Sequence, residues 1–119
     1  MGMTVVKMTI RKSRSAKASA EEEFLVDSGA AFTLAPGAVL RRLGIEPDED
    51  LDFFLADGEK ITRKVGEAYF ELGDKHGTSR VIFGKKGDSS LLGALTLETF
   101  GLMLDPLKRE LRAMRLTLM

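Results

Sequence analysis

The sequence of 119 residues contains no cysteine and a single histidine, His76. Without cysteine, the chain has no disulfide framework and no thiolate ligand for a metal ion. A lone histidine argues against a histidine-based zinc cluster and against a Ser-His-Asp triad. We therefore expect a protein that binds no metal.

An excess of charge of one sign is also missing, because 18 Lys and Arg residues balance 18 Asp and Glu residues. A net charge of zero gives no electrostatic reason to expect a nucleic-acid or membrane partner. No apolar stretch approaches the roughly 20 residues that span a bilayer. No apolar run follows a basic segment at the N-terminus, so we see no signal peptide. We expect a cytoplasmic protein with no nucleic-acid partner and no membrane association.

The sequence does contain enough apolar residues for one small core, since 44% of its residues are hydrophobic. This fits a single domain over residues 1–119. Short β-branched or alternating runs are separated by turn residues, a pattern typical of all-β proteins. We predict an all-β fold, a closed barrel with one or two short helices. The expected strands are 4–10, 24–26, 51–55, 59–65, 67–72, 79–83, 102–104 and 108–119, the expected helices are 36–43 and 95–100, and an acidic loop is expected at 46–52.

One segment combines a buried strand with chemically useful residues. Phe24-Leu25-Val26 is a short apolar run that ends abruptly at Asp27-Ser28-Gly29. A strand delivers the Asp27 carboxylate from a rigid element. The Ser28 hydroxyl can fix the turn by hydrogen bonding, and Gly29 lets backbone and substrate approach closely. Ala30, which follows, keeps the site open.

These residues resemble the active-site motif of aspartic proteases, Asp-Thr/Ser-Gly-Ala/Ser, which appears here as Asp27-Ser28-Gly29-Ala30. A second family element, two apolar residues and a glycine before a short helix, appears as Leu91-Leu92-Gly93. Residues 53–61 lie where the family carries its flap hairpin, and residues 101–106 are similar to the ending of small prokaryotic members. The resemblance runs from about Phe24 onward. It is to the retropepsin-like (retroviral-type, clan AA) aspartic proteases, and it implies the closed acid-protease barrel.

The number of motifs implies the assembly. The chemistry of the family needs two aspartates, but this chain has one motif, because Asp88-Ser89-Ser90 lacks the glycine and Asp57-Gly58 lacks the preceding strand. A second copy of the chain must supply the second carboxylate across a two-fold axis. The resemblance thus implies a homodimeric aspartic endopeptidase, which hydrolyses a peptide or protein substrate through a water activated by the two Asp27 side chains. It implies no cofactor.

The resemblance also assigns roles to single residues. Asp27 is the catalytic acid and base, Ser28 braces the two active-site turns across the axis, and Gly29 receives backbone contacts from bound peptide. Two alanines, Ala31 and Ala94, stand where retroviral enzymes usually carry polar residues. Polar contacts that those residues make near the substrate and the dimer interface are therefore not expected here. The implied substrate-binding residues are Leu25, Ala30, Ala31, Leu34, Ala56, Asp57, Gly58 and Leu91.

Other interpretations of the same segments remain. Asp27-Ser28-Gly29 alone could be an ordinary turn, and the fold could serve as a non-catalytic peptide-binding or dimerisation module. The basic stretch Lys7 to Lys17 could touch nucleic acid, although a charged edge hairpin that resists aggregation is favoured. The segment Gly84 to Ser90 superficially suggests a phosphate loop. It lacks the G-x-x-x-x-G-K-[ST] spacing, which favours a solvated hairpin loop.

Overall fold

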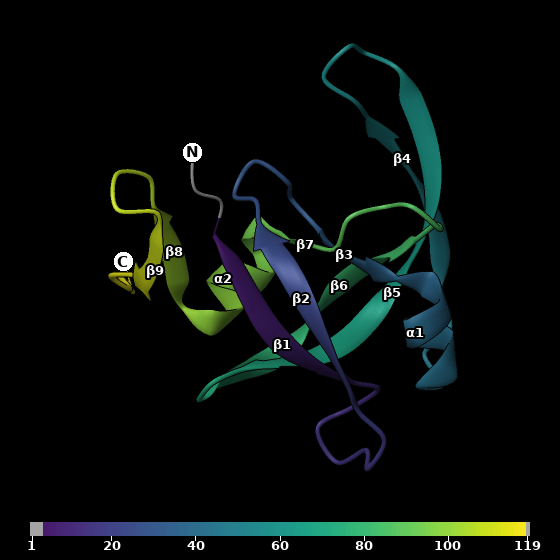
Figure 1. Ribbon diagram of the computed structural model, residues 1–119, viewed down its shortest axis with the longest axis horizontal. Coiled ribbons are helices and arrows are strands. Elements are labelled where there is room, and N and C mark those ends of the chain that lie inside the picture. Colours follow the sequence, from purple (N-terminus) through teal and green to yellow (C-terminus); the bar gives the residue numbers. More distant parts are fainter. Residues whose placement is uncertain (1–3, 119) are drawn as a thin grey trace.

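The computed structural model describes residues 4–118. Over these residues the chain forms mostly β-structure with two short helices (Figure 1). In chain order the elements are β1 (Val5–Arg11), β2 (Ala20–Val26), β3 (Thr33–Pro36), α1 (Gly37–Arg42), β4 (Glu49–Phe54), β5 (Lys60–Leu72), β6 (Lys75–Gly84), β7 (Leu91–Leu92), α2 (Ala94–Phe100), β8 (Leu102–Asp105) and β9 (Glu110–Ala113).

Seven of these strands form one sheet, in the order β1-β2-β7-β3-β6-β5-β4. Strand β1 also pairs with β5, so the pairings return to the strand from which they start. This ring of pairings fits the predicted barrel, and the all-β fold class is confirmed. Strands β8 and β9 form a separate antiparallel pair, on the side of the molecule where β1 begins (Figure 1).

The side chains that form the core come from alternate positions along the strands. Phe24 and Val26 in β2 are buried, and so are Met8 and Ile10 in β1, because side chains two residues apart point to the same face of a sheet. The rings of Phe24 and Phe70 meet edge to face with their centroids 6.2 Å apart. This arrangement suits the electrostatics of aromatic rings.

Both predicted helices are present, and glycine ends each of them. Helix α1 is followed by Gly44 with a φ of 83°, and α2 by Gly101 with a φ of 70°. Left-handed backbone of this kind costs glycine little, which makes glycine the usual residue there. Neither helix in residues 4–118 is long and apolar enough to cross a membrane.

The structure corrects three expectations about the middle of the chain. Strand β3 was not predicted, because it is short and ends in Pro36. The two strands expected on either side of Gly66 are one strand, β5. A Cβ at Gly66 would lie 3.0 Å from the Glu46 carbonyl oxygen. Glycine stands here because the Glu46 backbone packs closely against β5, and the strand continues through it without a turn. The expected acidic loop is partly wrong, because β4 begins at Glu49 and pairs with β5.

The tail differs as well. A strand was expected from Lys108 to Met119, but β9 covers Glu110–Ala113, residues 114–118 are not in a strand, and Met119 lies outside the described residues. The segment before β9 is held by Asp105, whose Oδ1 accepts hydrogen bonds from the backbone N–H groups of Leu107 (2.9 Å) and Lys108 (3.1 Å). This side-chain turn delays the start of the strand.

Candidate active site

Asp27 stands at the end of β2, on the turn that the motif predicts. Its carboxylate Oδ1 accepts a hydrogen bond from the Gly29 N–H at 3.0 Å. Its backbone N–H donates to the Leu92 carbonyl at 3.0 Å, and its carbonyl accepts from the Ala30 N–H at 3.1 Å. The half-buried carboxylate is therefore fixed through the backbone on both sides, while Oδ2 accepts no hydrogen bond from residues 4–118.

The Asp27 turn is tied to the segment around β7, more than sixty residues away in the sequence. Strand β7 lies between β2 and β3, and Leu91 is paired with Leu25 on one side and with Leu34 on the other. Beyond β7, the Ala94 N–H donates to the Ala30 carbonyl at 2.8 Å, and the Leu95 N–H donates to the Ala31 carbonyl at 3.0 Å. Backbone hydrogen bonds thus hold both ends of the turn, at Asp27 and at Ala30–Ala31.

Gly93 allows this close approach. A Cβ at Gly93 would lie 2.5 Å from both the carbonyl carbon and the carbonyl oxygen of Phe32, and 3.0 Å from the Ala30 carbonyl oxygen. These contacts are with backbone atoms that cannot rotate away. The glycine of the second motif is therefore required for packing against the Asp27 turn.

A cluster of buried hydroxyl groups lies directly behind the turn. Thr33 and Thr96 are fully buried, and their Oγ1 atoms are 2.5 Å apart. The Thr96 hydroxyl is also 2.9 Å from Ser79 Oγ. The Gly93 N–H donates to Thr33 Oγ1 at 3.0 Å. Sequence analysis missed this cluster, because the three residues are far apart in the chain and none stands in a recognisable motif.

Two hollows lie between the Asp27 turn and the flap, which we define as residues 53–61. Apolar side chains line both of them, and the second is also lined by Glu59, Arg63, Asp88 and Ser89. The first, of about 320 Å³, is closed on one side by Phe32 and Phe53, whose ring centroids are 5.6 Å apart. The second, of about 550 Å³, shares Leu34, Phe53 and Leu91 with the first. The first hollow is lined by Gly29, Ala30, Ala31, Phe32, Leu34, Phe53, Phe54, Ile82 and Leu91.

The predicted site residues are only partly brought together. Ala30, Ala31, Leu34 and Leu91 line the first hollow. Leu25 instead lines a third hollow of about 440 Å³, together with Asp27, Leu104 and Pro106. Leu25 is still directly opposite Leu91 in the sheet.

The remaining predicted residues lie at exposed positions. Ser28 and Gly29 are exposed on the turn. Ala56, Asp57 and Gly58 form the tip of the β4–β5 hairpin, which extends away from the sheet (Figure 1). The tip is closed by bonds from the Gly58 N–H to the Leu55 carbonyl and from the Leu55 N–H to the Glu59 carbonyl, both 2.8 Å. These three tip residues line neither apolar hollow.

Within residues 4–118 no group of three or more His, Cys, Asp or Glu side chains is placed to hold a metal ion. The candidate site presents a carboxylate that is fixed through Oδ1 and open at Oδ2, near hollows lined by apolar side chains. Such a carboxylate can accept a proton from water.

Comparison with known proteins supports the fold. No family model matches the sequence, and no curated protein matches it. Among solved structures, the chain is similar to the solution structure of simian foamy virus (mac) protease, with a TM-score of 0.57 and 18% sequence identity. The similarity covers 80% of this chain and 92% of that chain. At this identity the likeness concerns the fold alone, and this mostly β chain resembles a retroviral protease fold.

Proposed function

We propose that this protein is an aspartic endopeptidase that works as a homodimer, with one Asp27 from each copy. The observation that carries the proposal is the Asp27 turn. Its carboxylate is oriented by the Gly29 N–H at 3.0 Å, on a loop that backbone hydrogen bonds tie to Leu92 and Ala94. This turn occurs in a chain whose fold resembles that of a retroviral protease.

The homodimer is proposed because one carboxylate does not complete the chemistry. Apolar side chains that a partner copy could cover are exposed in the first strand and in the tail: Val5 is 54% exposed, Leu107 92% and Leu116 75%. Strand β9 pairs with β8 alone among the described strands, so its other edge is open to a strand from a second copy. These segments lie on one side of the molecule (Figure 1).

In the proposed mechanism the two Asp27 carboxyl groups share one proton, because two carboxylates in one site cannot both ionise easily. The ionised carboxylate takes a proton from water as the water oxygen attacks the peptide carbonyl carbon. The protonated carboxyl group transfers its proton to the carbonyl oxygen, which becomes a hydroxyl group, and is itself left as a carboxylate. Proton transfer to the amide nitrogen then allows the C–N bond to break, which releases a carboxylic acid and an amine.

Other residues would bind the substrate. The apolar hollows beside Leu34, Leu91 and Phe53 suit apolar substrate side chains. We assign Ser28 to a hydrogen bond between the two active-site turns, and the backbone around Gly29 and Ala30 to contacts with the peptide. The flap tip, Ala56 to Gly58, would cover the bound substrate.

The test is cleavage of a diverse peptide library by the wild type, by Asp27→Asn and by Asp74→Asn, over acid to neutral pH. Asp74 is an exposed turn residue between β5 and β6, so its substitution is a matched control for the loss of one carboxylate. We expect cleavage by the wild type and the control, and none by Asp27→Asn. Sedimentation at the assay concentration should show a dimer.

The other outcomes are informative. Equal cleavage by the wild type and Asp27→Asn would refute the mechanism, as would activity from a strict monomer. A dimer that binds peptides but cleaves none would favour the second candidate, a peptide-binding module. That candidate is supported by the apolar hollows, since they would hold peptide side chains with or without the Asp27 carboxylate.

A further inference from the structure

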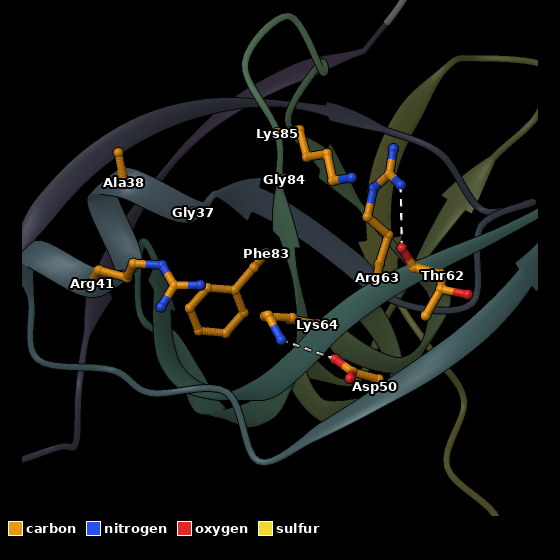
Figure 2. A pocket seen from close by; sticks show the side chains of 10 residues that line it. All are labelled: Gly37, Ala38, Arg41, Asp50, Thr62, Arg63, Lys64, Phe83, Gly84 and Lys85. Carbon is orange, nitrogen blue, oxygen red and sulfur yellow. Dashed lines mark hydrogen bonds and ion pairs between the residues drawn. The ribbon is translucent and has the colours of Figure 1, made fainter.

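A hollow of about 550 Å³ that does not include Asp27 lies between helix α1, strand β5 and the end of strand β6 (Figure 2). Its wall contains four cationic side chains, from three separate parts of the chain. The lining residues are Gly37, Ala38, Arg41, Asp50, Thr62, Arg63, Lys64, Phe83, Gly84 and Lys85.

The charges around this hollow are not balanced. Lys64 Nζ is 3.3 Å from Asp50 Oδ1, and Arg63 Nε is 3.9 Å from Asp88 Oδ2. The Arg41 guanidinium and the Lys85 ammonium group have no carboxylate within 4.0 Å in residues 4–118, although Asp88 Oδ2 accepts a hydrogen bond from the Lys85 backbone N–H at 2.8 Å. Four positive charges against the carboxylates of Asp50 and Asp88 leave two in excess, in a chain whose net charge is zero.

Arg63 is the most enclosed of the four cations. Its side chain is 17% exposed, and its Nε is buried without a hydrogen-bond partner among the described residues. One terminal nitrogen donates to the Thr62 carbonyl at 3.3 Å. A guanidinium has five N–H donors, and a partly desolvated cation with unused donors favours an anion nearby.

Arg41 is held in place from the opposite side of the hollow. Its guanidinium carbon lies 5.2 Å from the centre of the Phe83 ring, a cation–π geometry that restrains the side chain. Phe83 itself is 4% exposed and belongs to the core. The guanidinium edge remains available for paired hydrogen bonds to phosphate or carboxylate oxygens.

We propose that this hollow binds a small molecule with linked phosphate groups, through Arg41, Arg63, Lys64 and Lys85. Figure 2 shows Arg41 on one side of the hollow, Arg63 and Lys85 together on the other, and Lys64 between them. Cations on different sides of the hollow suit a ligand that carries several linked anionic groups. The linked phosphates could be free or part of a nucleotide. The inference does not depend on the proposed peptidase activity.

Calorimetric titration of the full chain with tripolyphosphate, and separately with ATP, tests this inference. We expect saturable binding with one ligand per chain. The double variant Arg41→Gln/Lys85→Gln should weaken it by about 100-fold, because each charge-assisted contact is worth about tenfold. The matched control is Arg42→Gln/Lys86→Gln, which removes the same charge from the two adjacent exposed residues outside the hollow. The control should bind like the wild type.

The outcomes separate the possibilities. Equal affinity for ATP and tripolyphosphate would identify the phosphate chain as the whole ligand, and tighter ATP binding would identify a nucleotide; both support the proposal. Equal weakening in the two double variants would overturn it, because binding would then follow net charge. No heat from either ligand at millimolar concentration, or tighter binding of a glutamate-rich peptide, would also overturn it. Thermal melts of both variants check that each is folded.

Discussion

The buried hydroxyl cluster behind the Asp27 turn can be tested by replacing Thr33 with valine. The substitution keeps the shape of the side chain and removes Oγ1, which accepts the Gly93 N–H at 3.0 Å and contacts Thr96 Oγ1 at 2.5 Å. The Gly93 N–H is left buried without a partner, at a cost of about 1–3 kcal/mol. Thr96 keeps its contact with Ser79. We expect a loss of about 2 kcal/mol in the free energy of unfolding.

The assay is urea unfolding followed by circular dichroism at one fixed protein concentration, since any dimer makes stability depend on concentration. A loss of this size corresponds to a fall in Tm of about 8 °C for a domain of this length. Ser79→Ala removes the hydrogen bond to Thr96 Oγ1 and a long one to the Arg80 carbonyl at 3.4 Å. It leaves no backbone N–H without a partner, so it should cost about 1 kcal/mol. Thr78→Val, at an exposed strand position, should change stability by less than about 0.5 kcal/mol. The reasoning would be refuted if Thr33→Val cost no more than Ser79→Ala.

Two further substitutions test the turn and the tail. Gly93→Ala should destabilise the fold by about 1–3 kcal/mol or more in the same assay, because its Cβ meets the Phe32 backbone at 2.5 Å; wild-type stability would mean that the turn is not packed against β7. For Asp105, hydrogen bonds from the N–H groups of Lys108 and Leu107 hold the pKa below its ordinary value of 3.8. Its stabilising effect should therefore be present above pH 3.8 and disappear as the pH falls through the folded pKa. The stability difference between wild type and Asp105→Asn should shrink in that acid range, and a difference that stays constant with pH would contradict this.

Several parts of the fold could be predicted because their causes are local. Gly44 and Gly101 end the helices through their own backbone conformation. The hairpin around Gly58 follows from a turn whose hydrogen bonds join residues 55–59. The apolar run Phe24-Leu25-Val26 indicates a short buried strand, and Phe24 and Val26 are buried in β2. Each of these signals lies within a few residues of the feature that it predicts.

The features that could not be predicted depend on contacts between distant segments. Thr33, Ser79 and Thr96 form one cluster only because β3, β6 and α2 pack together. Arg41 and Lys85 line one hollow because α1 lies beside the end of β6. The balanced charge of the chain therefore gave no indication of a local excess of positive charge. Gly66 was misjudged for a related reason, because the neighbours that require it lie in other elements.

This division between local and distant contacts bears on the proposed chemistry. The Asp27 carboxylate is oriented by a turn that is anchored to Leu92 and Ala94, over sixty residues away. Its geometry therefore exists only when the sheet is complete. The flap tip is closed by bonds within residues 55–59, so it can change its position without breaking contacts to the core. A peptidase of this kind needs a fixed carboxylate and a cover that opens for the substrate. In this chain the Asp27 turn is fixed to distant strands, whereas the flap tip is held by hydrogen bonds within its own hairpin.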